Sequence, residues 1–379
     1  MIKKKIKIIG SGPTGSLLAL FLAHKNYNVT LIDPLTDYEL CLKDKGYAIT
    51  QSSKKIFEKI DLWKILKFYA QGFNSLSIID DSLSKDVIIR TNDLKAFNKK
   101  EKDIGWVIEH KYLMQTLIDS INECKTIRRV SIDTTEDKNY DFIFAADGRD
   151  SSARKNWKIG YLRRFYNQRA LSFRARLIGG PKKRAYEIFR HEGPLALLPL
   201  ENNIYQVIWF ASPSETKERI KLSNPKLLEK LSNILPEKIT PELIISEISN
   251  YSIVQAFAFP KFNNFQNTLV GEAAHSFHPV GGQGLNSCLR DVYELSEMLN
   301  NYESANFLYR KFFALRYFLN RSIDILSILL FTDFLIKLFS NKFIIFYPLR
   351  FLIFYVLKNF KIVRVNVFSL MTDSIKRIW

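Results

Sequence analysis

The chain has 379 residues, of which 47% are hydrophobic and 25% charged, so it can bury a large core and is not expected to be disordered. Its net charge of +18 comes from 56 lysines and arginines against 38 acidic residues. No dense basic block interleaves with aromatic residues, which argues against nucleic-acid binding. The three widely spaced cysteines, Cys41, Cys124 and Cys288, predict reduced thiols and no metal site.

The N-terminal residues predict a strand, a glycine turn, a helix and a second strand. "MIKKKIKIIG" passes from basic residues directly into a β-branched strand, without the apolar segment of a secretory signal. Gly10, Gly12 and Gly15 then fit the pattern G-x-G-x-x-G. A Leu- and Ala-rich helix follows, and the second strand, Val29–Ile32, ends on Asp33. This arrangement is typical of a dinucleotide-binding unit, although close packing alone is the simpler alternative.

Each glycine of this pattern has a physical role in such a unit. Gly10 allows the tight turn, Gly12 lets the backbone approach a diphosphate, and Gly15 lets helix and strand pack closely. The free amides at the start of the helix favour the negative charge of the diphosphate. Asp33 is placed to accept hydrogen bonds from a ribose. The pattern does not separate FAD from NAD.

Two further motifs follow strands later in the chain. "YDFIFAADGRDSSAR", residues 140–154, is a buried strand that runs into Asp147 and Gly148. "NTLVGEAAHSFHPVGGQGLN", residues 267–286, places many conformationally permissive residues between a strand and a helix. Glycine costs backbone entropy, so a segment this rich in it indicates that a bare backbone is needed.

In this order the three motifs resemble those of the FAD-dependent aromatic hydroxylases, the single-component flavin monooxygenases, and most of all the ubiquinone-biosynthesis hydroxylases. Residues 48–66, 193–209 and 308–341 support the narrower match, and the resemblance covers essentially the whole chain. It implies an α/β fold with a discontinuous, Rossmann-like FAD-binding domain, a substrate domain built on a mixed or antiparallel sheet, and a C-terminal helical region. The expected boundaries are 1–72, 104–165 and 262–300 for the FAD-binding domain, 73–103 and 166–261 for the substrate domain, and 301–379 for the helical region.

The resemblance also implies FAD as the cofactor, NAD(P)H as co-substrate, and a set of cofactor-binding residues. In the family the third motif closes over the flavin, and its glycine loop lies along the ring edge where negative charge develops. No protein side chain is assigned to catalysis, and the candidates beside the ring are Pro279, Gly281, Gly282, Gln283 and Gly284. The cofactor-binding residues implied are Gly10, Gly12, Pro13, Thr14, Gly15, Asp33, Lys45, Lys111, Asp147, Gly148, Arg154, Gly271, Glu272, Pro279, Gly282, Gln283, Gly284, Leu285 and Asn286.

Several of these positions have simpler interpretations or depart from the family. Glu272 stands where the family usually has Asp, and Lys45 and Lys111 replace arginines, so both lysines could be ordinary solvated side chains. Asp147 could be a plain turn residue. Arg154 could form a surface ion pair or steady the motif loop. His275 and His278 lack a third metal ligand, and we expect His275 to hydrogen-bond locally rather than act as a base.

The middle of the chain predicts mostly strands. Residues 166–261 contain several apolar or alternating segments, and residues 73–103 are expected to add an edge to their sheet. Helices are expected around 214–235 and 240–247. Pro194, Leu197 and Pro199 would line the substrate side of the ring or, alternatively, pack in the core.

The last eighty residues predict aromatic-rich helices. Charged residues interrupt the apolar stretch 323–357, so no membrane span is expected. Beyond Ser340 there are seven Lys and Arg and one acidic residue, which fits a helix lying in a membrane interface. The basic side chains expected to reach lipid phosphates are Arg350, Lys358, Lys361 and Arg364. The alternative is that these helices pack on the protein's own core or form a dimer.

The resemblance therefore implies a monooxygenase that uses NAD(P)H and O2 to hydroxylate an aromatic ring, here a prenylated phenol intermediate of ubiquinone biosynthesis. The protein is expected at the cytoplasmic face of the inner membrane, with other quinone-pathway proteins as possible partners. One alternative is a flavin-binding structural member of such an assembly with little turnover. Another is a flavin-dependent prenyl reductase, whereas the absence of W-x-W-x-I-P disfavours a halogenase.

Overall fold

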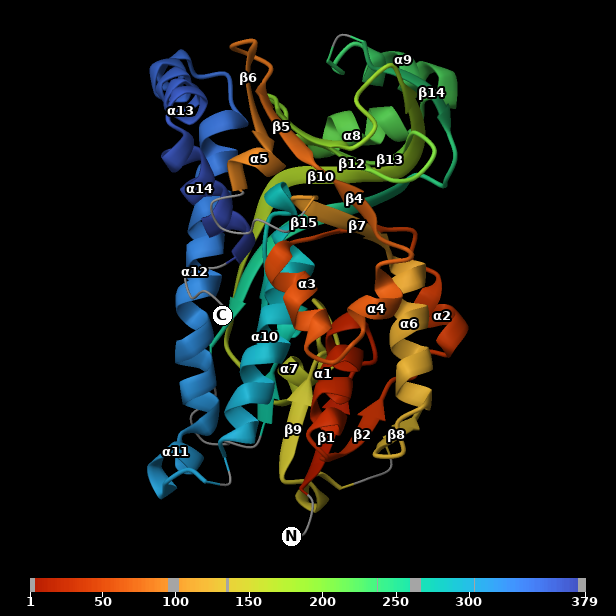
Figure 1. The fold of residues 1–379 in the computed structure, drawn as a ribbon, viewed down its shortest axis with the longest axis vertical. Coiled ribbons are helices and arrows are strands. Elements are labelled where there is room, and N and C mark those ends of the chain that lie inside the picture. The colour runs from red at the N-terminus through yellow and green to blue at the C-terminus, as the bar shows by residue number, and fades with distance from the viewer. Residues whose placement is uncertain are drawn as a thin grey trace.

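The computed structural model describes residues 4–94, 102–133, 136–236, 238–259, 267–302 and 304–373. Its strands form a five-stranded sheet, a nine-stranded sheet and a three-stranded sheet. Helices cover the five-stranded sheet, and a C-terminal group of helices lies along one side of both large sheets (Figure 1). The α/β fold class predicted from the sequence is confirmed.

The five-stranded sheet is parallel throughout. Its strands are, in spatial order, β16 (Asn267–Leu269), β9 (Phe142–Ala145), β1 (Lys5–Ile9), β2 (Asn28–Ile32) and β8 (Ile127–Val130). The carboxyl ends of parallel strands meet at one edge of a sheet. This edge therefore brings together the ends of the first strand, the second strand and the two strands that precede the later motifs.

Three long helices pack around this sheet. They are α1 (Pro13–His24), α6 (His110–Asn122) and α10 (Gln283–Asn300), and α1 packs against both of the others. All of α1 from Gly15 to Ala23 is buried, which explains why this helix is apolar on every side. The smaller elements beside it are α2 (Asp37–Cys41), α3 (Gln51–Glu58), α4 (Trp63–Leu66) and a sheet of β3 (Gly46–Ile49), β7 (Gly105–Glu109) and β4 (Gln71–Phe73).

The nine-stranded sheet is antiparallel except for one parallel pair. Its strands are, in order, β17 (His275–Ser276), β15 (Ser249–Ala258), β10 (Tyr161–Ile178), β13 (Ile204–Ala211), β12 (Leu195–Pro199), β11 (Arg184–Phe189), β5 (Ser75–Asp80) and β6 (Lys85–Arg90), with β14 (Thr240–Ile244) paired to β10. The parallel pair is β11 with β5. The mixed or antiparallel sheet and its edge from residues 73–103 are as predicted, while the boundary predicted at residue 165 falls inside β10.

The helix expected at residues 240–247 is wrong. The helices α8 (Pro213–Ile220) and α9 (Asn224–Ser232) are present, but the next segment is the strand β14. It pairs with the end of β10, where a register shift falls between Arg176 and Leu177. Thr240 and Ile244 are β-branched, and Ile244 is buried in the core under α9, so pairing and burial favour the strand.

The C-terminal region is helical, as predicted. It comprises α11 (Phe307–Lys311), α12 (Phe313–Phe339), η4 (Ile344–Phe346), α13 (Tyr347–Asn359) and α14 (Lys361–Asp373). The long helix α12 lies beside α10 and runs along much of the molecule's long axis (Figure 1). Phe313 and Tyr317 at its start join the core of the parallel sheet, so at least this part packs on the protein itself. None of the helices among the described residues has the length and apolarity that crossing a membrane requires.

Two of the basic residues expected to reach lipid phosphates are engaged inside the protein instead. Arg350 is buried, and its guanidinium donates to the backbone oxygens of Leu338 (2.8 Å) and Asn341 (3.1 Å). Arg364 forms an ion pair with Asp93 of the short helix α5 (Thr91–Leu94) at 2.9 Å. The expectation is wrong for Arg350, because Arg350 closes the turn between α12 and α13.

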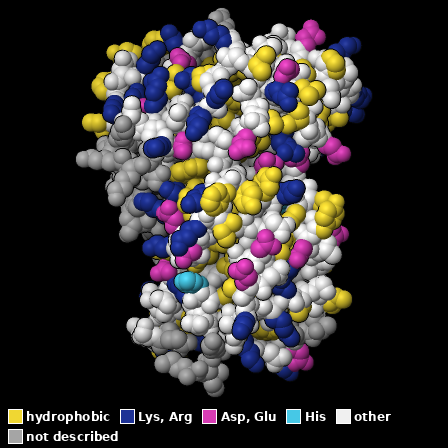
Figure 2. Space-filling model, turned by 45° about the vertical axis from the view of Figure 1, so that its right-hand side comes forward, with side chains coloured by type: hydrophobic (Ala, Val, Ile, Leu, Met, Phe, Trp, Pro, Cys, Tyr) yellow, Lys and Arg dark blue, Asp and Glu magenta, His cyan; other side chains and the backbone are white. Residues whose placement is uncertain are grey.

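The positive charge is spread over the face that Figure 2 shows. Figure 2 shows Lys and Arg side chains across one whole face, with Asp and Glu side chains among them. On this face they form no single continuous band.

Candidate functional site

The first glycine turn leaves an open place at the end of β1. Gly10 has a φ of +100°, and a Cβ on Gly15 would lie 1.9 Å from the Gly10 oxygen, so neither position tolerates a side chain. A Cβ on Gly12 would meet nothing within 4 Å. Close packing thus explains Gly10 and Gly15, but it gives no reason for glycine at position 12.

The N-terminus of α1 is free at this open place. Gly12 is its N-cap residue, no side chain caps the helix, and its first turn contains no acidic residue. The unpaired N–H groups and the helix dipole favour an anion there. Asp33 at the end of β2 closes the turn, because its carboxylate accepts from the N–H of Ser11 at 2.6 Å and of Leu35 at 3.0 Å.

Asp147 follows β9 and lies against the glycine turn. A Cβ on Gly10 would be 2.8 Å from the Asp147 Cα. One carboxylate oxygen, Oδ2, accepts from the N–H of Ala153 (3.0 Å) and the hydroxyl of Ser152 (3.2 Å), at the start of α7 (Ser152–Asn156). The other, Oδ1, is buried and has no hydrogen-bond partner among the described residues. If Asp147 were only a turn residue, there would be no reason for this second oxygen to be buried without a partner.

Arg154 holds the second and third motifs together. Its guanidinium donates to the backbone oxygens of Ala273 (2.7 Å) and Arg149 (2.9 Å). It also lies 3.7 Å from the centre of the Tyr161 ring, and the residue is only 4% exposed. A surface ion pair is therefore the wrong interpretation, and Arg154 steadies the motif loop.

The third motif leaves a second free helix N-terminus. Gly281 and Gly282 have φ values of +73° and +65°, which turn the chain sharply from η3 (Val280–Gly282) into α10. The helix α10 begins after Gly282 without a side-chain cap and without an acidic residue in its first turn. A Cβ on Gly284 would meet nothing within 4 Å. The first N–H groups of α10, which have no intrahelical acceptor, therefore lie beside open space at Gly284.

The side chain of Asn286 fixes this helix end to the rest of the protein. Its amide nitrogen donates to the oxygens of Ala48 and Gly282, both at 2.8 Å, and its oxygen accepts from the hydroxyl of Ser53 at 2.6 Å. Gln283 likewise donates to the Gly281 oxygen at 3.0 Å. At these two positions the side chains bond within the protein and hold the loop in place. A ligand at this loop would therefore contact its backbone.

The three charged residues that depart from the family pattern are exposed. Glu272 follows Gly271 in η2 (Gly271–Ala273). Burial is the main cause that raises the pKa of Tyr47 on β3 and of Tyr251 on β15, and the negative charge of Glu272 is the next largest cause. The pKa of Tyr251 rises to about 12. The Glu272 carboxylate therefore lies near both tyrosine side chains. Lys45 lies 5.2 Å from the Tyr47 ring centre, and Lys111 lies 5.8 Å from that of Tyr112. Both positions suit solvated lysines.

Behind the third motif lies a buried network of charges that sequence reasoning missed. Asp291 on α10 accepts from His275 Nε2 (2.6 Å), the Gly271 N–H (2.9 Å) and Arg321 Nε of α12 (2.6 Å). Arg321 also pairs with Asp324 at 2.7 Å, and Asp324 pairs with Arg290 at 3.0 Å. The sequence could have indicated this network, because it places the charged residues Arg290, Asp291, Arg321 and Asp324 inside otherwise apolar helices.

The network keeps Asp291 ionised. Burial raises the pKa of its carboxyl, but His275 and Arg321 outweigh this effect and hold the pKa below its ordinary value. His275 therefore bonds locally, as expected from the sequence. His278 is also buried, with Nε2 3.0 Å from the Gln168 side-chain oxygen and Nδ1 accepting from the Val280 N–H at 3.2 Å. Burial lowers the pKa of His278 to about 3, so it is neutral near pH 7.

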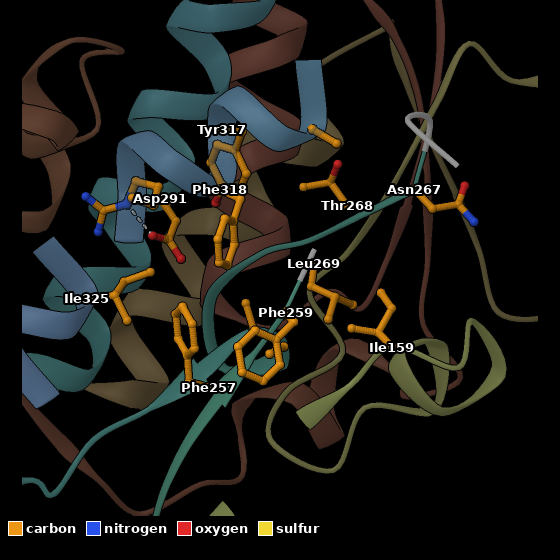
Figure 3. Close-up of a pocket in the computed structure, with 14 residues that line it drawn as sticks. Ile159, Phe257, Phe259, Asn267, Thr268, Leu269, Asp291, Tyr317, Phe318 and Ile325 are labelled. Carbon is orange, nitrogen blue, oxygen red and sulfur yellow. Dashed lines mark hydrogen bonds and ion pairs between the residues drawn. The ribbon is translucent and has the colours of Figure 1, made fainter. Parts of the chain in front are cut away.

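An apolar pocket lies on the far side of this network, between β16 and α12. Its cavity volume is about 50 Å³. Figure 3 shows the rings of Phe257, Phe259 and Phe318 around it, with the Asp291 carboxylate at one side. The pocket is therefore separate from the open places beside the glycine turns.

Leu197, expected on the substrate side, belongs to the core instead. It packs in the buried cluster that contains Leu227 and Leu231 of α9, on the opposite face of the nine-stranded sheet from Val280. For this residue the alternative of core packing is the correct one.

Comparison with known proteins identifies the family. Residues 88–305 match the FAD binding domain family. The chain belongs to this family. A ubiquinone hydroxylase, UbiL, of Rhodospirillum rubrum is 26% identical over 88% of this chain and 81% of its own length. The 3-demethoxyubiquinol 3-hydroxylase of Escherichia coli is 23% identical over 79% and 80%. The structure of p-nitrophenol 4-monooxygenase from Pseudomonas putida superposes with a TM-score of 0.80 at 15% identity, over 97% of this chain and 96% of that one.

The family confirms FAD as the cofactor and the assignment to FAD-dependent monooxygenases. The residues present fit this cofactor. An elongated molecule with a central diphosphate matches two uncapped helix N-termini, the open places beside Gly12, Gly148 and Gly284, and the unpartnered oxygen of Asp147.

Proposed function

We propose that this FAD-binding protein holds its cofactor along the carboxyl edge of the parallel sheet. The diphosphate would lie at the N-terminus of α1, the ribose beside Asp33, and the ring along Pro279 to Gly284 at the N-terminus of α10. The observation that carries the proposal is that β1, β2, β9 and β16 all end at this edge, each followed by a predicted cofactor-binding residue.

We propose that the protein hydroxylates the ring of a prenylated phenol in ubiquinone biosynthesis, using NAD(P)H and O2. The relatives that are named as ubiquinone hydroxylases support this substrate class. Bound FAD supplies the redox chemistry and the activation of O2. The N–H groups at the start of α10 stabilise negative charge at the ring edge, and Arg154 keeps the second and third motifs in place. The apolar sheet above the loop excludes water.

The test of this function uses the FAD-loaded protein with NADPH, 18O2 and a 2-prenylphenol, followed by mass spectrometry. A product that is one labelled oxygen heavier, formed only with substrate, is expected. A product two hydrogens heavier would instead identify a prenyl reductase. Stable FAD binding with no NADPH oxidation for any phenol tested would identify a structural member of a quinone-pathway assembly and reject the enzyme.

We propose further that the C-terminal helices rest on the surface of a membrane, at its cytoplasmic face. An apolar stripe is exposed on α12, and its members follow helical spacing: Leu319, Ile323, Leu326, Leu330 and Phe334. The segment after it exposes Phe343, Ile344 and Ile345 by 68–81% and is followed by exposed lysines at 358 and 361. Exposed apolar side chains beside basic ones favour an interface with anionic lipid.

Binding to vesicles tests the membrane proposal. The double variant Ile344→Glu/Ile345→Glu should weaken sedimentation with phosphatidylglycerol vesicles by about tenfold or more, because two apolar side chains would no longer be buried. Ile132→Glu is the matched control, since Ile132 is 73% exposed but lies beyond β8, away from the C-terminal helices. Equal binding by all three proteins, or no binding by the wild type, would reject the proposal.

A further inference from the structure

Glu187 occupies an unusual place in the nine-stranded sheet. Side chains alternate along β11, and Tyr186 and Ile188 are buried in the core beneath α9. Ala185 and Phe189 face the other side. There Phe189 packs in a cluster with Val280 of residues 279–284, which we call the flavin loop because the ring is proposed to lie along it. Glu187 lies between them on this same face. A carboxylate therefore stands in an otherwise apolar surface that faces the flavin loop.

The carboxylate of Glu187 is only partly satisfied by the protein. The N–H of Gly281 donates to it, which ties it to the loop proposed to lie along the flavin ring. Its Oε1 is buried from solvent and has no hydrogen-bond partner in the part of the chain that the structure describes. A buried, unpaired oxygen of a carboxylate is costly, so its persistence indicates that a donor from outside the chain completes the site.

The surroundings give this group a useful acidity. Burial raises the pKa of Glu187 to about 7, and the Gly281 N–H only partly offsets that effect. Among the described residues, no charged side chain of β5, β12 or α10 contributes to the shift. Asp80 of β5 lies opposite Phe189 in the strand register. Burial raises the pKa of Asp80, the charge of Arg350 on α13 lowers it, and Asp81 raises it slightly, whereas Glu187 does not contribute. The carboxyl therefore exchanges its proton near neutral pH.

We propose that Glu187 is the residue that accepts the hydroxyl proton of the phenolic substrate. The inference rests on the proposed function. The O–H of the phenol donates to Oε1 and its proton passes to the carboxylate, while the electron pair stays on the phenol oxygen. The ring becomes richer in electrons, which favours transfer of an electrophilic oxygen atom to it. The proton returns to the phenol oxygen or to water when the product leaves.

Other polar groups near the flavin loop are less suited to this role. His278 uses both ring nitrogens within the protein, and Asp291 uses both carboxylate oxygens behind the third motif. Glu272 is exposed and lies beside Gly271, towards the diphosphate end of the proposed cofactor site. Glu187 alone of these combines a free oxygen with a place on the sheet above the loop.

Ligand binding to the oxidised, FAD-loaded protein tests the proposal without turnover. The probes are 2-allylphenol and its methyl ether, 2-allylanisole, titrated from pH 5.5 to 8.5 while the flavin absorbance is followed. The wild type should prefer the phenol, and this preference should increase about tenfold as the pH rises through 7, because a charged acceptor strengthens the hydrogen bond. The anisole cannot donate, so its affinity should not increase.

Two variants separate the role of Glu187 from a structural one. Glu187→Gln should keep its FAD but lose the pH-dependent preference for the phenol, whereas Glu201→Gln removes the same charge from an exposed turn of this sheet and should behave as the wild type. A pH-independent preference in the wild type, or an unchanged pH dependence in Glu187→Gln, would overturn the proposal. The 18O2 experiment can fail while this binding result holds, so the two proposals fail separately.

Discussion

The buried network behind the third motif allows a strong test of the structure. Replacing Asp291 by Asn keeps the shape of the side chain but removes the charge that Arg321 and His275 face at 2.6 Å. Removing one partner of a buried ion pair costs about 3–5 kcal/mol, and asparagine can still accept two of the three hydrogen bonds. We therefore expect Asp291→Asn to lower the free energy of unfolding by about 3 kcal/mol.

Thermal and urea unfolding of the FAD-free protein measure this loss. Unfolding entropy is about 2.1 cal/mol/K per residue, or roughly 0.8 kcal/mol/K for a chain of this length, so the melting temperature should fall by about 4 °C. FAD affinity should also fall, because Asp291 holds the N–H of Gly271 at 2.9 Å. The control is Asp61→Asn, whose side chain is 68% exposed in its pair with Lys64, and which should change stability by less than about 1 kcal/mol.

The effect should depend on pH in one direction. The pKa of Asp291 is lowered by folding, so its stabilisation is complete above the unfolded pKa of about 3.9 and is lost as the pH falls through the folded value. The difference between wild type and variant should be constant from pH 5 to 8 and shrink in acid. A variant as stable as the wild type at pH 7 would refute the buried ion pair, and with it the tie between α12 and the third motif.

Three further outcomes follow from single positions. Gly12→Ala should leave the unfolding of the FAD-free protein unchanged but weaken FAD binding at least tenfold. Gly15→Ala should instead destabilise the fold itself, because its Cβ would lie 1.9 Å from the Gly10 oxygen. Differential scanning calorimetry measures the change in stability, and flavin fluorescence measures the change in FAD binding. Because burial lowers the pKa of His278, wild-type stability should fall as the pH drops from about 6.5 towards 3, by up to about 1.4 kcal/mol per pH unit, and His278→Gln should reduce this slope in urea titrations. The buried Cys288 thiol, whose pKa burial raises, should react with a disulfide reagent only after unfolding, as counted by thiol titration.

Local patterns were enough to predict the first unit of strand, glycine turn, helix and strand, and the strands that precede the two later motifs. The Rossmann-like domain that joins these strands was implied by the resemblance to the FAD-dependent hydroxylases. The segment 240–247 misled because its apolar residues are too few to distinguish a helix from a strand. Its state is decided by pairing with β10, which is distant in the sequence.

The side-chain roles were less accessible from the sequence. Nothing local indicates that Arg154 binds two backbone oxygens or that Arg350 is buried against the end of α12, since both contacts depend on how separate elements pack. The same is true of Glu187, because its partner Gly281 is 94 residues away in the chain. The spacing of glycines in the sequence predicts where the backbone carries no side chain. Which charged side chains are buried depends on how elements that are distant in the sequence pack together.

The helix α12 connects the proposed membrane surface to the proposed flavin site. One side exposes the apolar stripe from Leu319 to Phe334, and the other inserts Arg321 and Asp324 into the network that holds Gly271 and His275. A rotation of this helix about its axis would bury apolar side chains of the stripe but separate Arg321 from Asp291 and Asp324 from Arg290, which would break two buried ion pairs between α12 and α10. The buried pairs therefore fix which face of α12 points outward. A surface suited to lipid is in this way held in a fixed orientation to the loop on which the flavin ring is proposed to lie.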